Sequence, residues 1–396
     1  MMLTPPTMAE TPANVQDRFM TLDNAALLIG GKQQVYFSYK ADTPMVPAST
    51  MKVLMAYEAL ETWGRDHHFT TDFYLTDKNT LCVKGSGDPF LTSSELLTAA
   101  LNISFRELPE LAGLTLDTSF FGQDITVDGR TQTLNPYDAP LSALAANFNT
   151  VSLKKTSQSV ISAEEQTPLT ELARSLSEKI NRGSHRINVQ STENGEQQFA
   201  EIMMSFLQSS GVKIKNSIHH GSCGQNSQLV YQHENSHPLE EQVRGMLKYS
   251  NNFIANQLFL LLGAKQLAST PLSRLHFQQK VQENLGWKKG RIVDGAGLSR
   301  KNRFTANEMV SLLERFKPYA DLLNCYGDVC AKTGTLSGVQ TLAGYIKHRG
   351  ELVPFALFVN EPVARNFRIE LIQDWADAMN QLEPVLVAQN DSLSSE

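Results

Sequence analysis

The sequence predicts an α+β fold in which one domain is split in two by an inserted domain. Strand and helix patterns are mixed along all 396 residues, and no internal repeat is visible. Three short polar motifs occur in order, one near the N-terminus and two beyond residue 245. Because these motifs are expected to meet in one site, the chain between them is expected to form the insertion. The resulting segments are the first part of the split domain at 1–68, the inserted domain at 69–242, the second part at 243–390 and a disordered tail at 391–396.

The spacing of apolar residues predicts the elements along the chain. Residues 25–38 predict two short strands around a Gly-Gly turn. A helix is expected over 49–63, with Val53, Tyr57 and Leu60 on its apolar face. The other expected elements are a strand-rich segment at 69–90, helices at 169–180, 198–209, 239–248, 252–262, 271–285, 306–316 and 364–379, and strands at 331–335, 340–348 and 352–360.

The composition is that of an ordinary globular protein, with 41% hydrophobic residues, 19% charged residues and a net charge of −6. No basic patch has the density expected of a nucleic-acid-binding surface. The longest apolar run, 253–264, contains Asn256 and Gln257 and is too short to span a bilayer. We therefore expect neither a nucleic-acid partner nor an integral membrane segment.

The N-terminal sequence and the cysteines bear on whether the protein is secreted. MMLTPPTMAETPANVQ has neither the basic region nor the apolar segment of a secretory signal, so either the signal is absent from this chain or the protein stays inside the cell. Four cysteines permit two disulfides, but four buried thiols fit the sequence equally well. Neither CxxC nor a Cys/His cluster with zinc spacing occurs. The cysteines are Cys82, Cys223, Cys325 and Cys330.

The first motif is Ser49-x-x-Lys52, at the predicted start of a helix. The free N–H groups and the positive dipole end of a helix favour negative charge that develops at Ser49. Lys52 lies on the same helix face and is the candidate base, provided that burial or a nearby cation such as Lys332 keeps it neutral. A second Ser-x-x-Lys at 152–155 is expected to be a solvated strand end, because a single match carries little weight.

The other two motifs, Ser250-x-Asn252 and Lys332-Thr333-Gly334, each occur once. The order Ser-x-x-Lys, Ser-x-Asn, Lys-Thr-Gly is the signature shared by serine β-lactamases and penicillin-binding proteins. In that setting Ser250 relays a proton to the leaving amine and Asn252 hydrogen-bonds the substrate amide. A simple helix cap is the structural alternative for both residues.

The Lys-Thr-Gly motif is expected to open a strand beside the substrate. Lys332 and Thr333 are the candidate groups for holding a terminal carboxylate, and Gly334 would let the substrate approach the backbone. The backbone N–H groups of Ser49 and Thr335 are expected to form the oxyanion hole. Each such donor typically contributes about 10²–10³ in rate.

Residues 233–237 spell HENSH, a literal match to the HExxH motif of zinc peptidases. That motif binds zinc only on a helix, where both histidines face one metal. Pro238 follows directly and disfavours helical backbone at His237. We therefore expect a loop that leads into the next helix, and no metal site.

With these motifs, the chain resembles the D-Ala-D-Ala carboxypeptidase/endopeptidase family of the penicillin-binding protein 4 type, the class C low-molecular-mass penicillin-binding proteins. The resemblance implies a β-lactamase/transpeptidase-like core, with an antiparallel sheet flanked by helices and an inserted smaller α/β domain. It implies a serine DD-peptidase that removes the terminal D-alanine from peptidoglycan stem peptides through an acyl-enzyme, is inhibited by β-lactams and needs no cofactor. The segments that carry it are VPASTMKVL, KGSGDPFL, YDAPLSALAANFN, SHPLEEQVRGMLKYSNNFIANQL, DGAGLSRKNR and AKTGTLSGVQTLAGY.

The resemblance also implies a location and a further part of the site. Arg300 and Tyr137 fall where the family builds its pocket for the substrate side chain. The expected location is periplasmic, with the signal sequence not present in this chain. Ser49 and Ser250 are closer in sequence than is usual in the family, so one of its two inserted domains is expected to be missing or vestigial. The acidic residue that some members have before the Tyr137 position has no counterpart in TQTLN.

Three alternatives stay open at this point. A serine β-lactamase shares the motifs, but it usually has a far shorter distance from nucleophile to Ser-x-Asn, and the deacylating Glu of class A enzymes cannot be placed. A penicillin-acylated, non-catalytic sensor or binder has the same sequence features, because turnover depends on water access to the acyl-enzyme. Cleavage of D-Ala cross-links is the third, although a carboxylate-binding Lys332 and Thr333 modestly favour carboxypeptidase activity.

Overall fold

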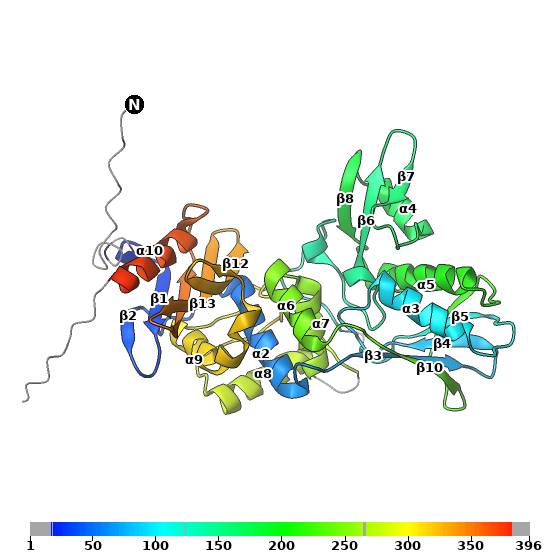
Figure 1. The fold of residues 1–396 in the computed structure, drawn as a ribbon, viewed down its shortest axis with the longest axis horizontal. Helices are drawn as coiled ribbons and strands as arrows, with labels where there is room; N and C mark the ends of the chain where they lie inside the picture. Colours follow the sequence, from blue (N-terminus) through cyan, green and yellow to red (C-terminus); the bar gives the residue numbers. More distant parts are fainter. Residues whose placement is uncertain (1–16, 18, 123, 264–266, 382–396) are drawn as a thin grey trace, which may run out of the picture.

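The largest unit of the structure is a six-stranded antiparallel sheet with the order β11-β12-β13-β14-β1-β2 (Figure 1). The computed structural model describes residues 17, 19–122, 124–263 and 267–381. β1 pairs with β14 in the register Leu27↔Leu357, so segments from both ends of the chain meet inside this sheet. Its strands are β1 (Ala25–Gly30), β2 (Val35–Tyr39), β11 (Cys325–Tyr326), β12 (Val329–Leu336), β13 (Val339–His348) and β14 (Glu351–Val359).

Alternate residues along the strands of this sheet face two different hydrophobic cores. On β1, Ala26 and Leu28 pack with the larger helix layer. Leu27 and Ile29 on the same strand pack with α10 (Phe367–Gln381). The two-residue period of a strand therefore requires apolar residues at every position of β1. The larger layer contains α2 (Met51–Trp63), α6 (Leu239–Tyr249), α7 (Asn252–Gly263), α8 (Thr270–Leu285) and α9 (Ala306–Phe316).

Two smaller sheets come from the chain between α2 and α6. The five-stranded sheet has the order β10-β3-β4-β5-β9 and packs with α3 and α5, whereas the three-stranded sheet, β7-β6-β8, packs with α4 around a separate small core (Figure 1). The bounds are β3 (Thr70–Leu75), β4 (Thr80–Lys84), α3 (Ser93–Ser104), β5 (Gly113–Asp117), β6 (Thr150–Lys155), β7 (Val160–Ser162), α4 (Glu171–Ser177), β8 (Gly183–Asn188), α5 (Thr192–Ser209), β9 (Ile218–His220) and β10 (Gln228–Glu234).

The predicted fold class is confirmed, since an antiparallel sheet flanked by helices carries an insertion with α/β character. All strands of the two smaller sheets fall within 69–242, and all strands of the large sheet fall outside it. The division at 68 and 242 stays a prediction that this pairing supports. The insertion contains two separate hydrophobic cores, so it is built from two units of unequal size. The predicted tail at 391–396 lies outside the described residues.

The main element that the sequence analysis missed is α3, because no helix was expected between residues 90 and 169. The pattern was nevertheless in the sequence, because its buried positions recur with helical spacing. Those positions include Leu96, Ala99, Ala100 and Ile103. Helix α5 also begins earlier than expected, at Thr192, because the side chain of Ser191 caps it.

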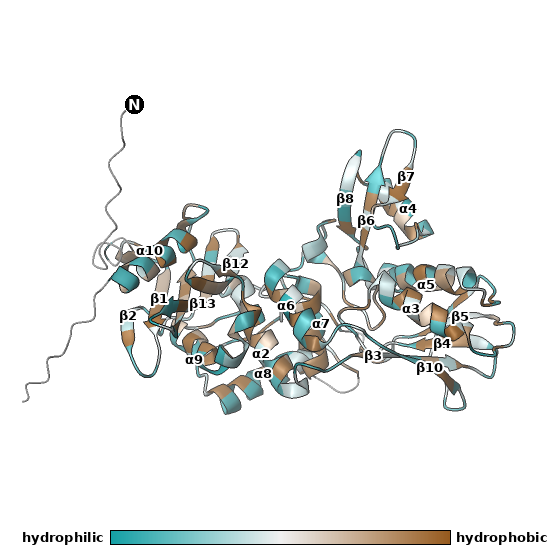
Figure 2. Cartoon of the chain, in the orientation of Figure 1, coloured by the Kyte–Doolittle hydropathy of each residue, from teal (hydrophilic) through white to brown (hydrophobic). Residues whose placement is uncertain are grey.

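Most helices that cover the sheets are amphipathic. Figure 2 shows hydrophilic and hydrophobic residues side by side along α5 and α9, as expected for helices with one buried face. Helix α7 is an exception, because it is buried on nearly all sides between α2, α6 and α8. In the described part of the chain, no helix is long and apolar enough to cross a membrane.

The cysteines form two disulfides, so the alternative of four thiols is wrong. Cys82 on β4 is bonded to Cys223, which lies between β9 and β10, and the bridge spans 141 positions. Cys325 is bonded to Cys330 across the β11–β12 hairpin, and this bridge spans 5 positions. A longer closed loop removes more conformational freedom from the unfolded chain.

Replacing Cys82 and Cys223 by serine is expected to destabilise the protein more than replacing Cys325 and Cys330. The loop-entropy description assigns about 5 kcal/mol to the long loop and about 2 kcal/mol to the short one. The free energies of unfolding, measured by urea denaturation without reductant, test this difference. Equal losses for the two double variants would contradict it.

Candidate active site

Ser49 lies in a 3-10 turn, Ala48–Thr50, that leads directly into α2. Close backbone packing surrounds this turn. A Cβ on Gly334 would lie 2.8 Å from the Ser49 nitrogen, and a Cβ on Gly297 would lie 1.9 Å from the Ala48 oxygen. Glycine at Gly334 is therefore required so that the Lys-Thr-Gly strand can approach the serine turn, which differs from the expected reason, room for the substrate.

Lys52 lies one helical turn after Ser49 and is fully buried. Its Nζ is 3.1 Å from Ser49 Oγ and donates hydrogen bonds to Asn252 Oδ1 and to the Ala296 oxygen, each at 2.8 Å. Burial, and then the positive charge of Lys332, lower the pKa of Lys52 well below its usual value. The surroundings of Lys52 therefore favour a neutral amine.

The Ala296 carbonyl group is positioned by a buried polar network in the loop 294–302. Asn256 Oδ1 on α7 accepts hydrogen bonds from the Gly295 and Ala296 N–H groups at 2.8 and 3.0 Å. The Asp294 carboxylate accepts hydrogen bonds from backbone N–H groups within the loop. The sequence analysis noted this segment but assigned no role to Asn256 or Asp294, because neither lies in one of the three motifs.

Ser250 and Asn252 lie where α6 ends and α7 begins. Ser250 has left-handed backbone dihedrals, φ 54° and ψ 40°, which turn the chain between the two helices. Asn252 Oδ1 faces the buried amine described above, and Asn252 Nδ2 donates to the Tyr137 oxygen at 3.1 Å. The helix cap is instead made by Asn251, whose Oδ1 accepts from the Ile254 N–H group at 3.1 Å. A capping role therefore does not account for Asn252.

The Lys-Thr-Gly motif lies within β12, at an open edge of the large sheet. β11 pairs only with residues 329 and 330 of β12. Among the described residues, the part of β12 from 332 to 336 is paired on its β13 side alone, whereas the Ala331 N–H group still donates to the Asn324 oxygen at 2.9 Å on the other side. Alternate residues of a strand share a face, so Lys332 lies on the same face as Gly334, next to the serine turn.

Arg368 is the charged residue at this strand that the sequence analysis missed. It lies near the start of α10, and its Nη1 donates hydrogen bonds to the Gly334 oxygen and to Thr335 Oγ1, the latter at 2.7 Å. Burial, and then the Arg368 guanidinium, lower the pKa of Lys332 to about 8. Lys332 Nζ donates to the Thr333 oxygen at 2.8 Å. No motif or helical period connects Arg368 with β12, so only the tertiary fold reveals this contact.

The remaining two predicted residues contact different parts of the site. Arg300 is exposed, and its Nη2 donates to the Ser337 oxygen at 2.5 Å, in the turn between β12 and β13. Tyr137 is 55% exposed, and its backbone oxygen accepts the hydrogen bond from Asn252. One residue therefore borders the Lys-Thr-Gly strand and the other borders the Ser-x-Asn segment.

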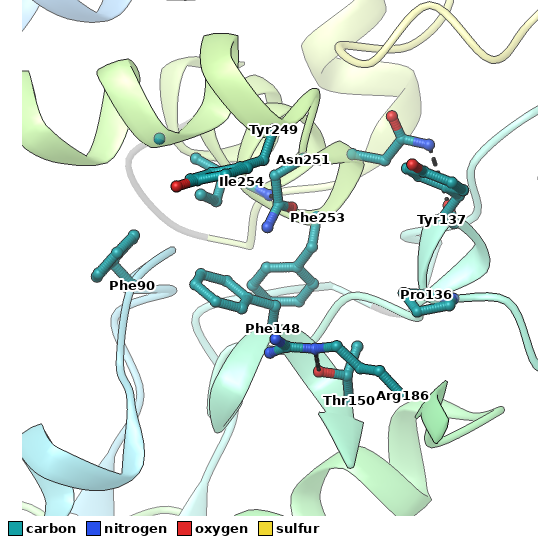
Figure 3. A pocket seen from close by; sticks show the side chains of 12 residues that line it. Phe90, Pro136, Tyr137, Phe148, Thr150, Arg186, Tyr249, Asn251, Phe253 and Ile254 are labelled. Carbon is teal, nitrogen blue, oxygen red and sulfur yellow. Dashed lines mark hydrogen bonds between the residues drawn. The ribbon is translucent and has the colours of Figure 1, made fainter. Parts of the chain in front are cut away.

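A cavity of about 500 Å³ lies next to Asn252, between the α6–α7 junction and the insertion. Figure 3 shows the rings of Phe148 and Phe253 close together on one side of it and Tyr249 on the other. Five aromatic residues contribute to its lining, and it adjoins the candidate site through Asn252 and Tyr137. The cavity therefore offers apolar surface to the part of a large ligand that extends beyond the serine.

The HENSH segment, 233–237, forms no helix. His233 and Glu234 end strand β10, so the expected loop begins later than predicted. His233 is buried, with Nε2 2.8 Å from Glu95 Oε2 on α3. Burial raises the pKa of Glu95, but hydrogen bonds from His233 and Ser236 outweigh this and lower it to about 2. Among the described residues, no group of three or more His, Cys, Asp or Glu side chains could hold a metal ion.

The chain matches the model of the D-Ala-D-Ala carboxypeptidase 3 (S13) family over residues 15–175, 161–326 and 314–379. It is 25% identical over 404 residues to D-alanyl-D-alanine carboxypeptidase DacB of Haemophilus influenzae, and the match covers 83% of each chain. The family resemblance noted from the sequence is therefore confirmed.

The fold is similar to that of solved structures. The crystal structure of penicillin binding protein 4 (dacB) from Haemophilus influenzae aligns with a TM-score of 0.77 at 23% identity, over 93% of this chain and 100% of that one. The same protein complexed with a novel β-lactam aligns with a TM-score of 0.70. A predatory peptidoglycan endopeptidase from Bdellovibrio bacteriovorus aligns with a TM-score of 0.53 at 15% identity, over 91% of this chain and 92% of that one.

The two histidines of HENSH are expected to respond differently to substitution. His233→Ala removes the imidazole that forms a hydrogen bond with the buried Glu95 carboxylate and is expected to lower the free energy of unfolding by about 1–3 kcal/mol. His237→Ala, at a partly exposed position, is expected to change it by less than about 1 kcal/mol. Purified protein is expected to contain zinc well below one equivalent, and a chelator should leave the unfolding midpoint unchanged. Stoichiometric zinc that is lost in both variants would contradict the structural role.

Proposed function

The chain belongs to the D-Ala-D-Ala carboxypeptidase 3 (S13) family, and on this premise we propose that it is a serine DD-peptidase that removes the terminal D-alanine from peptidoglycan stem peptides. The observation that carries the proposal is the hydrogen-bonded group of Ser49, Lys52 and Asn252, which joins two of the three motifs around a buried amine. The third motif approaches the same serine turn through Gly334. The reaction passes through an acyl-enzyme at Ser49, and β-lactams inhibit it by acylating the same oxygen.

In this mechanism Lys52 is the base that takes the Ser49 proton. A neutral amine has two N–H groups and one lone pair. The oxygens of Asn252 and Ala296 accept the two N–H groups, so the lone pair is left for the Ser49 hydroxyl 3.1 Å away. Deprotonated Ser49 then attacks the carbonyl carbon of the penultimate D-alanine.

The oxyanion that forms in this attack is held by the backbone N–H groups of Ser49 and Thr335. The position of Gly334 against the Ser49 nitrogen supports this pair, because Thr335 is the next residue on the strand. Ser250 passes a proton to the departing amine, and water then releases the shortened peptide from the enzyme.

The substrate is bound on both sides of the serine. Lys332 and Thr333 bind the terminal carboxylate, while Asn252 donates to the substrate amide through the second N–H of Nδ2, the first being donated to Tyr137. Arg300 and Tyr137 contact the side chain of the stem peptide, one from the β12–β13 turn and the other from the rim of the aromatic cavity.

The proposed location is the periplasm, where the stem peptides are exposed. The two disulfides support this location, because such bridges form and persist in oxidising compartments. Cleavage of D-Ala cross-links is a second candidate activity, since the fold is shared with a peptidoglycan endopeptidase.

Fluorescent penicillin is expected to label the protein covalently at Ser49, and Ser49→Ala is expected to abolish the labelling. Ser152→Ala is the matched control, because Ser152 belongs to the second Ser-x-x-Lys and donates to Glu164 on the insertion. Mass analysis of a defined muropeptide mixture is expected to show loss of one D-alanine from pentapeptides with wild-type protein and none with Ser49→Ala.

Other product patterns would contradict this assignment in distinct ways. An adduct at Ser152 would overturn the choice of nucleophile. Cross-linked dimers cleaved to monomers beside intact pentapeptides would make endopeptidase the main activity. Labelling of Ser49 without any peptide product would identify a sensor.

The pH dependence of kcat/KM is expected to be bell-shaped, because two lysines have opposite requirements. Lys52 must be neutral, so the rate rises as pH rises through its lowered pKa. Lys332 must be charged to bind the carboxylate, so the rate falls as pH rises above its pKa of about 8. Lys332→Arg keeps its charge at alkaline pH and is expected to move the falling limb upward. An unchanged limb in a folded Lys332→Arg variant would show that another group controls it.

A further inference from the structure

Arg368 connects α10 with the strand that carries the Lys-Thr-Gly motif. Its Nη1 donates to the Gly334 oxygen and to Thr335 Oγ1. Thr333 and Thr335 are two residues apart on β12, so their hydroxyl groups lie on the same face of the strand. The Arg368 guanidinium is thereby held on the face that also presents the Thr333 hydroxyl.

The protein does not use all the donors of this guanidinium. Arginine has five N–H groups in a rigid fork that matches the two oxygens of a carboxylate. In the described part of the chain, Arg368 makes hydrogen bonds through Nη1 only, and its buried Nε has no partner. The Nη2 group of Arg368 is therefore left to donate to a carboxylate beside Thr335.

The charges around this guanidinium also call for an anion. The positive charge of Arg368 acts on Lys332, since it contributes, after burial, to the lowered pKa of Lys332. Within the described residues, neither cation is paired with a carboxylate group. A buried Lys332 and a half-buried Arg368 that both lack a carboxylate partner are unfavourable until an anion binds beside them.

We propose that Arg368 is a specificity-determining residue that contacts the substrate and binds the carboxylate of the departing residue together with Lys332 and Thr333. This inference rests on the proposed function, which already places that carboxylate at the Lys-Thr-Gly motif. The Nη2 group of Arg368 adds further N–H donors to the ammonium of Lys332, so molecules without this carboxylate are expected to acylate Ser49 more slowly. A purely structural Arg368, which only ties α10 to β12, would lack this discrimination.

Acylation of Ser49 by benzylpenicillin and by its methyl ester separates the two roles, because only the first carries a free carboxylate. Second-order acylation rates of the full chain are measured by intact mass. Wild type is expected to prefer the acid. Arg368→Gln is expected to slow acylation by the acid about 10- to 100-fold, as for loss of a charged hydrogen bond, and by the ester less than about 3-fold. Arg368→Lys keeps the charge but not the planar guanidinium group. Its rate of acylation by the acid should therefore lie between those of wild type and Arg368→Gln.

Arg365→Gln is the matched control, since Arg365 is exposed and precedes α10 on the same segment. It is expected to leave both rates unchanged. Unfolding midpoints of all variants show whether the fold is kept. Equal slowing of the acid and ester reactions in folded Arg368→Gln would overturn the inference and leave a structural role.

The same proteins distinguish a failure of this inference from a failure of the proposed function. Peptide hydrolysis by wild type tests the proposed function, whereas the acid-to-ester ratio tests Arg368 without any need for turnover. A protein that cleaves no peptide but loses its acid preference in Arg368→Gln supports the inference and refutes the DD-peptidase. A protein that cleaves peptides while the ratio is unchanged in Arg368→Gln refutes only the inference.

Discussion

The buried amine of Lys52 is the contact on which the arrangement of the site depends. It joins three segments that are far apart in sequence: the turn of Ser49, the start of α7 through Asn252, and the loop of Ala296. A charged ammonium in this position would be costly, because the surroundings are withdrawn from water and a second lysine lies nearby. Burial therefore favours the neutral amine of Lys52, which is the form that the proposed base requires.

The fold brings these segments together by pairing the ends of the chain. β1 lies between β14 and β2 in the large sheet, and α2 follows β2 in the chain. The helix of Ser49 is therefore connected to the same sheet, here called the frame, that contains β12 and β13. The insertion leaves this frame after α2 and returns to it before α6. It can therefore vary in size without moving Ser49 relative to the Lys-Thr-Gly strand, and it forms one side of the cavity beside Asn252.

The three motifs and the helical and strand periods predicted the large sheet and the candidate site in outline, because both depend on local patterns. Helix α3 was missed although its apolar spacing is helical. The disulfide partners could not be chosen from four cysteines, since pairing depends on tertiary proximity. Arg368 and Asn256 were missed for the same reason, because each acts through hydrogen bonds to one distant segment. The role of Gly334 was misjudged because the sequence does not show which backbone lies beside it.

The contact of bare backbone at Gly334 and Gly297 constrains how drug resistance can arise in this protein. No side chain separates the serine turn from Gly334 and Gly297, so a substitution at either glycine is not expected to shift Ser49, the proposed nucleophile, in small steps. Any added methyl group displaces the turn and disables the normal reaction together with acylation by the antibiotic. Substitutions that slow acylation by β-lactams are therefore expected at exposed positions around the site, such as Arg300, Tyr137 and the residues that line the cavity. Side chains can change there while Ser49 stays in place.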